Sequence, residues 1–203
     1  DTDRSRGLGD VYKRQVNHYR LDELLVKHFG DRAGLVLDLA SYMVVEGRNQ
    51  GQYYPDYAYR HPLFSPGMRI YSDSTVSKFL SSVKDEQIAG FLNDWNTDRD
   101  HKSRIYVSYD STNKNCQAGD VDFVEFGKAK VDLGLPIFNV GLAMDQNNRI
   151  PLFYELYPGS INDVSQFKFM VDKAVGYGYK NIGFIIDRGY FCKANIRYMD
   201  EKN

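Results

Sequence analysis

The sequence predicts an α/β fold in which a helical N-terminal region precedes a mixed β-sheet. Residues 182–186 form a short apolar run rich in β-branched side chains, which is typical of a strand buried in the middle of a sheet. Residues 104–113 alternate apolar and polar side chains, as a half-buried strand does. Residues 19–46 and 74–95 instead carry apolar residues at helical spacing. A helical region therefore precedes the first strand of the chain.

Composition limits the classes of protein that need to be considered. The 203 residues are 42% apolar, enough for one large domain or a domain with a smaller companion. The formal net charge of -1 predicts neither a nucleic acid nor a membrane as partner, so a nucleic-acid surface would have to be a local patch. No apolar run approaches the roughly 20 residues that cross a bilayer, and we expect no membrane partner. Cys116 and Cys192 stand far apart, which argues against a disulfide framework or a structural zinc site and favours a reducing compartment.

The first residues differ from the rest. Residues 1–15 have no apolar periodicity, and we predict a disordered tail there. They also resemble a translated sequencing adaptor, so they are excluded from the fold prediction and the natural start of the protein is expected to be missing.

The helical region is predicted to run over residues 16–98. Residues 19–46 hold two helices, and residues 48–72 form a polar, tyrosine-rich loop broken by three prolines. The helical pair at 74–95 fits either a helix-turn-helix that binds DNA or a plain αα-hairpin. A charged linker follows, and a second domain is predicted over residues 99–203.

The second domain reads as strand, strand, strand, helix, strand, helix. After the strand at 104–113 and a long loop, residues 136–145 and 149–157 form a hairpin. Asp163 can cap the next helix, which Gly176 and Gly178 are expected to end. The first three strands can form an antiparallel meander, and the helix then returns the chain to a strand parallel to the first. This order is the ribonuclease-H-like arrangement.

Both strands of the expected parallel pair end on a carboxylate. Asp110 follows the alternating residues of the first strand, and Asp187 follows the apolar run at 182–186. Ligands bind at such strand ends in open α/β sheets. If the strands are neighbours, the two aspartates form half of a divalent-metal site, with their carboxylates within about 4–7 Å of each other.

Three segments, in order, carry a resemblance to a known family. They are Tyr109-Asp110-Ser111-Thr112, the stretch from Gly127-Lys128-Ala129-Lys130 to Pro158-Gly159-Ser160-Ile161-Asn162-Asp163, and Asp187-Arg188-Gly189-Tyr190-Phe191. Residues 103–203 with these segments resemble the catalytic domain of DDE-type transposases of bacterial insertion sequences, in the branch with a Tyr-Arg-Glu-Lys signature.

The resemblance implies a site and a chemistry. Asp110 would bridge two Mg²⁺ (or Mn²⁺) ions and Asp187 would hold one of them, for DNA strand cleavage and strand transfer by phosphoryl transfer. Lys128, Lys130 and Arg188 would contact DNA phosphates. The implied partner is double-stranded DNA at element ends and target, and the implied location is the bacterial cytoplasm, in association with the nucleoid. The full-length protein is expected to be a homo-oligomer.

The sequence departs from the family in one respect. The family's third carboxylate, a glutamate, lies well beyond the second aspartate, whereas this chain stops at Asn203. Glu201 lacks the signature spacing and is not assigned. The chain is therefore expected to be a truncated and inactive fragment.

Other readings of the same residues stay open. Asp163 is better explained as a helix cap than as a ligand, and Lys128 and Lys130 serve equally well as phosphate contacts or as solvated surface. Two alternative functions fit the scaffold: a ribonuclease-H-like nuclease, or a DNA-binding remnant that does no chemistry.

Overall fold

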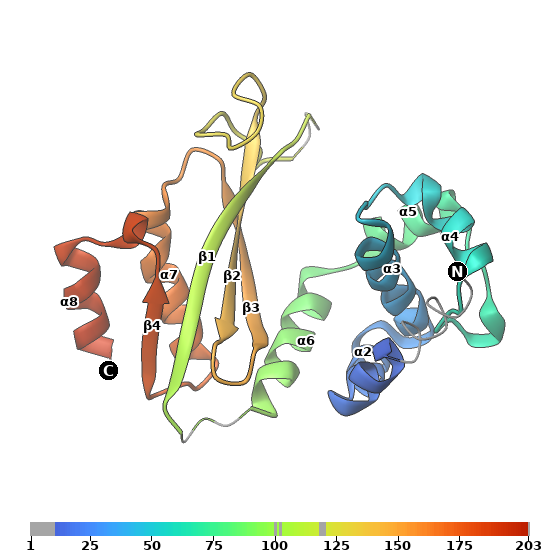
Figure 1. Cartoon of the computed structure of the whole chain (residues 1–203), viewed down its shortest axis with the longest axis horizontal. Coiled ribbons are helices and arrows are strands. Elements are labelled where there is room, and N and C mark those ends of the chain that lie inside the picture. Colours follow the sequence, from blue (N-terminus) through green and yellow to red (C-terminus); the bar gives the residue numbers. More distant parts are fainter. Residues whose placement is uncertain (1–10, 100, 102, 118–120, 203) are drawn as a thin grey trace. The chain divides into compact units, whose positions relative to one another are not determined.

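The computed structural model describes residues 11–99, 101, 103–117 and 121–202 (Figure 1). Contacts divide the chain into two compact units, Asp1–Asp94 and Trp95–Asn203. Each unit is described by itself below.

The first unit is helical. Its elements are α2 (Leu21–Phe29), a 3₁₀ turn η1 (Gly30–Arg32), α3 (Ala33–Glu46), η2 (Gly51–Tyr53), α4 (Tyr54–Arg60), η3 (Pro66–Met68), α5 (Asp73–Ser82) and the greater part of α6 (Asp85–Thr97). The two helices expected in residues 19–46 and the helical pair at 74–95 are confirmed.

Two parts of the first unit differ from the sequence prediction. Of the predicted tail at 1–15, residues 1–10 lie outside the described residues, but residues 11–18 are helical. Val16 on this helix is buried in a cluster with Leu25 and Leu37, and this burial explains why the segment is ordered. The predicted loop at 48–72 contains α4. Pro55 does not prevent this helix, because it stands in the first turn, where a helix tolerates proline.

A buried carboxylate fastens this loop to α3. Asp38 is 1% exposed, and its oxygens accept hydrogen bonds from Phe64 N (2.5 Å) and Ser65 N (3.1 Å). Burial raises the pKa of Asp38, while these hydrogen bonds act in the opposite direction. Tyr54 and Tyr57 from α4 pack in the adjacent core, and burial raises the pKa of Tyr57 to about 12.

The second unit is built on a four-stranded sheet in the order β3-β2-β1-β4 (Figure 1). The strands are β1 (Ile105–Asn115), β2 (Ile137–Asp145), β3 (Ile150–Pro158) and β4 (Ile182–Ile186). β1 pairs antiparallel with β2 and parallel with β4, and β2 pairs antiparallel with β3. Helix α7 (Asp163–Gly176) makes the crossover, a turn η4 (Arg188–Tyr190) follows β4, and α8 (Lys193–Lys202) ends the described chain. The predicted ribonuclease-H-like mixed sheet is confirmed.

One face of the sheet packs against α7. Alternate residues of β1, namely Ile105, Val107 and Tyr109, are at most 4% exposed and join a core with Phe167 and Met170 of α7. On β4 the residues of this face are Ile182, Phe184 and Ile186. The period-two alternation of both strands therefore decides which side chains face the helix and which face away.

Two details of the strands differ from the sequence prediction. β1 does not end at Asp110 but continues to Asn115, because β2 goes on pairing with it as far as Ile137. Within the described residues β4 pairs with β1 alone and stands at the edge of the sheet, and Ile185 is 48% exposed. The apolar run at 182–186 was therefore not a sign of a strand buried on both faces.

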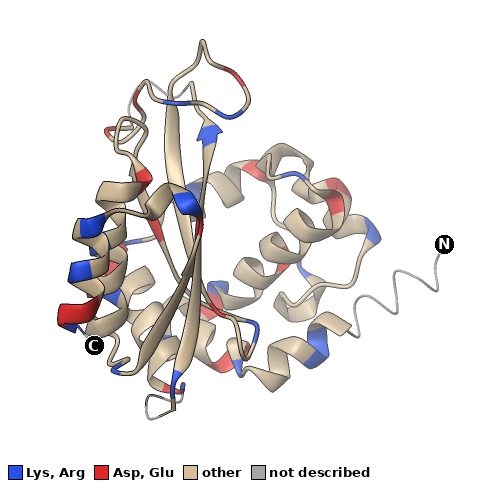
Figure 2. Ribbon diagram, turned by 60° about the vertical axis from the view of Figure 1, so that its left-hand side comes forward, with Lys and Arg blue, Asp and Glu red and all other residues tan. Residues whose placement is uncertain are grey.

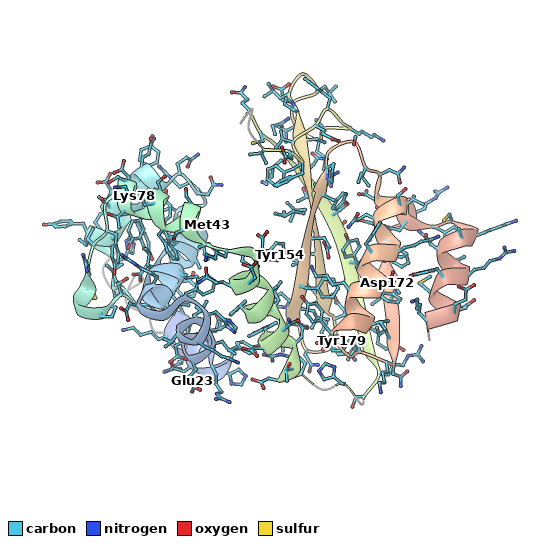
Figure 3. The ribbon with its side chains drawn as sticks, turned by 180° about the vertical axis from the view of Figure 1, so that it is seen from behind. Glu23, Met43, Lys78, Tyr154, Asp172 and Tyr179 are labelled. Carbon is cyan, nitrogen blue, oxygen red and sulfur yellow. The ribbon has the colours of Figure 1, made fainter. Side chains whose placement is uncertain are left out.

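The start of the second unit is fixed to β3. Trp95 is 7% exposed, and its indole Nε1 donates to the carbonyl oxygen of Pro151 (2.7 Å). Asn96 donates to the carbonyl oxygen of Leu152 (2.9 Å) and accepts from the hydroxyl of Tyr179 (2.9 Å), which is labelled in Figure 3. Pro151 lies on β3, an edge strand, where a missing N–H is tolerated.

Candidate functional site

The register of the parallel pair brings the two predicted aspartates to the same level of the sheet. Tyr109 of β1 pairs with Ile186 of β4, the last residue of that strand. Asp110 and Asp187 are the next residue on each chain. Asp187 keeps an extended backbone (φ -67°, ψ 156°) before η4 begins. Neighbouring strands lie about 4.8 Å apart, so the register makes these two residues neighbours across the strand pair.

The two carboxylates also share a face of the sheet. Tyr109 and Ile186 both face α7, and side chains alternate along a strand, so Asp110 and Asp187 belong to the opposite face. The preceding pairs on that face are Tyr106 with Gly183 and Ser108 with Ile185. A Cβ atom at residue 183 would lie 2.6 Å from the ring of Tyr106, so glycine is required for this ring to cover β4. The aspartates thus follow two cross-strand pairs on this face, Tyr106 with Gly183 and Ser108 with Ile185.

Each carboxylate is held by the chain that carries it. Asp110 Oδ1 accepts from the backbone N–H of Ser111 (2.8 Å), and Asp187 Oδ1 accepts from the backbone N–H of Arg188 (2.5 Å). Both aspartates are exposed. Their other oxygens are therefore accessible from solvent.

Tyr190 is buried near the acidic residues at this end of the sheet. Burial, together with the charges of Asp163, Asp110 and Asp187, raises the pKa of Tyr190 to about 12. Tyr190 is 2% exposed and packs against Tyr109 with ring centroids 5.5 Å apart.

The donor set suits a hard divalent cation. Carboxylate oxygens are the ligands that Mg²⁺ prefers, and Mg²⁺ keeps several waters and takes one or two carboxylates from the protein. Two exposed aspartates at adjacent strand positions fit that requirement. Within the residues that the structure describes, no three or more His, Cys, Asp or Glu side chains are grouped so that they could hold a metal ion.

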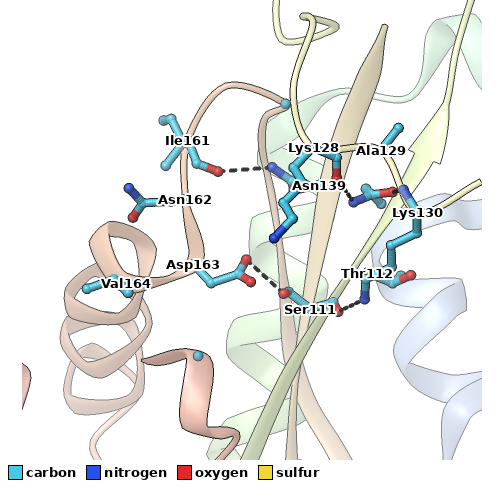
Figure 4. A pocket seen from close by; sticks show the side chains of 13 residues that line it. Ser111, Thr112, Lys128, Ala129, Lys130, Asn139, Ile161, Asn162, Asp163 and Val164 are labelled. Atoms are coloured by element: carbon cyan, nitrogen blue, oxygen red, sulfur yellow. Dashed lines mark hydrogen bonds between the residues drawn. The ribbon is translucent and has the colours of Figure 1, made fainter. Parts of the chain in front are cut away.

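A cavity of about 420 Å³ lies beside the start of α7 (Figure 4). Its lining includes two of the predicted phosphate contacts, Lys128 and Lys130, together with Ser111, Asp163 and Gly189. Lys130 Nζ donates to the carbonyl oxygen of Ser111 (2.8 Å), so one of its donors serves an internal contact. Lys128 is exposed, and its carbonyl oxygen accepts from the side chain of Asn113 (3.0 Å).

The third predicted phosphate contact, Arg188, is not among the residues that line this cavity, although its neighbour Gly189 is. Arg188 is exposed and opens η4 directly after Asp187. Arg188 is thus the chain neighbour of Asp187. Lys128 and Lys130 instead lie with Ser111 and Asp163 around the cavity at the start of α7. Along the ribbon, positions of lysine and arginine are interspersed with positions of aspartate and glutamate (Figure 2). No helix in the described residues combines the length and apolarity that a bilayer crossing needs.

Asp163 has a different role from the predicted cap. The α7 cap is Asn162, whose side-chain oxygen accepts from Ser165 N (2.9 Å). Asp163 is the first residue of the helix, and its Oδ1 accepts from the hydroxyls of Ser111 (2.8 Å) and Tyr157 (2.7 Å). No local pattern in the sequence indicates these contacts of Ser111 and Tyr157 with Asp163, because the residues that form them are not close neighbours along the chain.

Comparisons with known proteins complete the description. No protein-family model and no curated protein matches the chain. Among solved structures, the chain is similar to a Mos1 transposase paired-end complex with the left transposon end, at 13% identity and a TM-score of 0.32, over 82% of this chain and 56% of that one. It is also similar to the mariner Mos1 paired-end complex with Mg, at 13% identity and a TM-score of 0.30, over 87% of this chain and 58% of that one. The chain spans less than two thirds of the length of either structure.

Proposed function

We propose that the second unit carries the first two carboxylates of a divalent-metal site for phosphoryl transfer on DNA, in a DDE-type transposase of a bacterial insertion sequence. The observation that carries this proposal is the pairing of Tyr109 with Ile186, which makes Asp110 and Asp187 neighbours on one face of the sheet. The three sequence segments that resemble the transposase family contain these aspartates in the family's order.

The acidic and the basic residues have different roles in this proposal. Asp110 and Asp187 would hold the divalent ions, Mg²⁺ or Mn²⁺, because both are exposed and belong to the same face of the sheet. Two such ions supply activation of an attacking water or 3′-hydroxyl and stabilisation of the leaving oxygen. Arg188 directs its guanidinium to a phosphate beside the aspartates. Lys128 and Lys130 contact the DNA backbone farther along β1, independently of base sequence.

The proposal includes the partners of the intact protein. Double-stranded DNA at the element ends and at the target is the substrate. The working form is a homo-oligomer, since two element ends have to be processed together. The reaction takes place in the bacterial cytoplasm, on nucleoid DNA.

Metal binding provides the direct test. We expect Mn²⁺ to bind the chain, as followed by the loss of the free-ion signal in electron paramagnetic resonance. Asp110→Ala and Asp187→Ala should each weaken binding by at least about 10-fold, because each removes one of two carboxylate ligands. Asp172→Asn is the matched control, since it removes an exposed carboxylate on α7 that is bonded to Tyr198 and Lys202.

The control separates a site from general attraction of the cation. If Asp172→Asn weakens Mn²⁺ binding as much as Asp110→Ala does, the ion is held by overall negative charge and the site does not exist. If Asp110→Ala binds Mn²⁺ as tightly as the unmodified chain, the metal-site proposal is wrong.

The DNA contacts have their own test. Binding of a double-stranded oligonucleotide should weaken as salt rises, and the slope of log K against log salt should fall by about one in Arg188→Ala and in Lys128→Ala. Lys173→Ala is the control, because Lys173 is engaged with Glu155 (2.7 Å). An unchanged slope in both variants would exclude these residues from the DNA interface.

A further inference from the structure

Ser111, the residue after Asp110, is held through every polar group it has. Its N–H donates to Asp110 Oδ1 (2.8 Å), its hydroxyl donates to Asp163 Oδ1 (2.8 Å), and its carbonyl oxygen accepts from Lys130 Nζ (2.8 Å). Ser111 is 7% exposed. These bonds fix the backbone of β1 at Ser111, and the N–H of Ser111 in turn holds the Asp110 carboxylate.

Asp163 is the fixed end of this connection. It is the first residue of α7, where the helix dipole favours a negative charge, and its Oδ1 also accepts from the hydroxyl of Tyr157 (2.7 Å). Tyr157 is 3% exposed and lies near the end of β3. Asp163 thereby connects α7 and β3 to β1 through one oxygen atom.

The turn that carries Asp163 is itself fixed to the sheet. Asn139 of β2 is 7% exposed, and its side-chain amide donates to the carbonyl oxygens of Pro158 (2.9 Å) and Ile161 (3.2 Å). Figure 4 shows the bonds from Asn139 to Ile161 and from Ser111 to Asp163 side by side at the start of α7. The turn from β3 to α7 is therefore held in place before it reaches Asp163.

We propose that Asp163 is a positioning residue for the metal site, acting through Ser111 to set the orientation of the Asp110 carboxylate toward Asp187. This inference rests on the proposed function. Partners behind a metal-ligating side chain orient that side chain, and their loss lowers metal affinity by about 10–100-fold. Asp163 acts through Ser111 and not as a ligand, because α7 covers one face of the sheet while Asp110 and Asp187 belong to the opposite face.

The bonding pattern of Asp163 offers a way to separate positioning from direct ligation. Both of its hydrogen bonds end on Oδ1, and an asparagine can present a carbonyl oxygen at that position. Asp163→Asn therefore keeps both bonds but removes the negative charge, whereas Asp163→Ala removes both bonds. A metal ligand would lose its function in both variants, and a positioning residue loses it only in the second.

The experiment measures Mn²⁺ affinity by isothermal titration calorimetry for the unmodified chain, Asp163→Asn, Asp163→Ala and Ser111→Ala. We expect Asp163→Asn to bind within about 3-fold of the unmodified chain, and Asp163→Ala and Ser111→Ala to bind about 10-fold more weakly.

General destabilisation requires a separate control. Asn96→Ala breaks the buried bonds to Leu152 and Tyr179 at the other end of β3 and should lower the melting temperature without changing Mn²⁺ affinity. If Asn96→Ala weakens Mn²⁺ binding as much as Asp163→Ala does, loss of stability explains the effect and the inference is overturned.

The remaining outcomes separate this inference from the proposed function. If Asp110→Ala weakens Mn²⁺ binding but Asp163→Ala does not, the metal site stands and the positioning role is wrong. If Asp163→Asn weakens binding as much as Asp163→Ala, Asp163 acts through its charge, and the positioning role is again wrong. If the unmodified chain does not bind Mn²⁺ at all, the proposed function fails first and the inference with it.

Discussion

Tyr109 of β1 and Ile186 of β4 are paired in parallel register, and each is followed by an aspartate. The pairing places two negative charges at neighbouring positions at the end of β4. Like charges directly across a strand pair destabilise a sheet, by about 0.2–1 kcal/mol. We therefore expect a repulsion between the two carboxylates that the proposed cation would remove.

Asp110→Asn should accordingly raise the melting temperature of the metal-free protein. The expected gain in the free energy of unfolding is about 0.2–1 kcal/mol. Addition of Mn²⁺ should raise the melting temperature of the unmodified chain and have little effect on the variant. Differential scanning calorimetry with EDTA and with Mn²⁺ measures both changes. A variant that is less stable than the unmodified chain in EDTA would contradict the close approach of the two carboxylates.

Gly141→Ala should destabilise the sheet by about 1–3 kcal/mol, because it inserts a methyl group into a filled space. The ring of Tyr109 covers Gly141, and an added Cβ atom would lie 2.6 Å from Cζ of that ring. Gly176→Ala at the end of α7 is the control, since an added Cβ atom there meets no other atom within 4 Å. Urea unfolding followed by far-ultraviolet circular dichroism gives both free energies.

Removal of the Tyr109 hydroxyl gives a second test of the packing between Tyr109 and Gly141. Among the described residues this is a buried hydroxyl with no hydrogen-bond partner, so Tyr109→Phe should be neutral or stabilising. The double variant with Gly141→Ala should recover part of the loss, because the clashing oxygen is gone. Strict additivity of the two changes would show that the ring does not cover residue 141.

Asp38→Asn should change how the stability of the first unit depends on pH. Burial raises the pKa of Asp38 above its ordinary value of 3.8, so the folded state binds this proton more tightly than the unfolded state does. The contribution of Asp38 to stability therefore increases as pH falls through its folded pKa, and it levels off below the ordinary value. The difference in unfolding free energy between the unmodified chain and Asp38→Asn should rise from pH 7 toward pH 4.

Comparison with the variant removes the opposing effect of other carboxylates. Hydrogen bonds from Lys27 and then His28 lower the pKa of Asp94, so its contribution is lost as pH falls, in both proteins alike. Urea titrations at several pH values measure the difference. A difference that falls or stays constant between pH 7 and pH 4 would show that Asp38 is not a buried carboxylate with a raised pKa.

Asn139→Asp should be strongly destabilising although it changes only one atom. The side-chain amide donates to the carbonyl oxygens of Pro158 and Ile161, and a carboxylate leaves both without a donor, at about 1–3 kcal/mol each. The loss should shrink on acidification, because a protonated carboxyl regains one donor. Asn181→Asp, at an exposed position, should have little effect in the same chemical unfolding assay.

Local patterns account for the elements that the sequence predicted well. The bounds of β4 and the end of α7 at Gly176 follow from an apolar run and from a helix-terminating glycine. The pair of aspartates was also predictable, because each directly follows a residue that the alternation assigns to a strand. Their common face follows from the same alternation once the strands are known to be neighbours.

The parts that the sequence did not predict depend on distant contacts. β1 continues past Asp110 over polar residues that show no apolar alternation, and it does so because β2 supplies hydrogen-bond partners. The position of β4 at the edge of the sheet depends on which strands are present to pair with it. The bond from Ser111 to Asp163 joins residues 52 positions apart, and the presence of a serine and an aspartate does not predict that they are bonded.

Because Trp95 is hydrogen-bonded to Pro151 of β3, the fluorescence of Trp95 reports on the folding of the sheet unit. The chain contains one tryptophan, and its buried indole lies at the first residue of that unit. Tryptophan emission moves to longer wavelength when the ring enters water, so a shift in this protein records the opening of the contact between α6 and β3. Melting of the sheet unit can therefore be followed without a label, in the background of a helical unit that contributes no tryptophan signal.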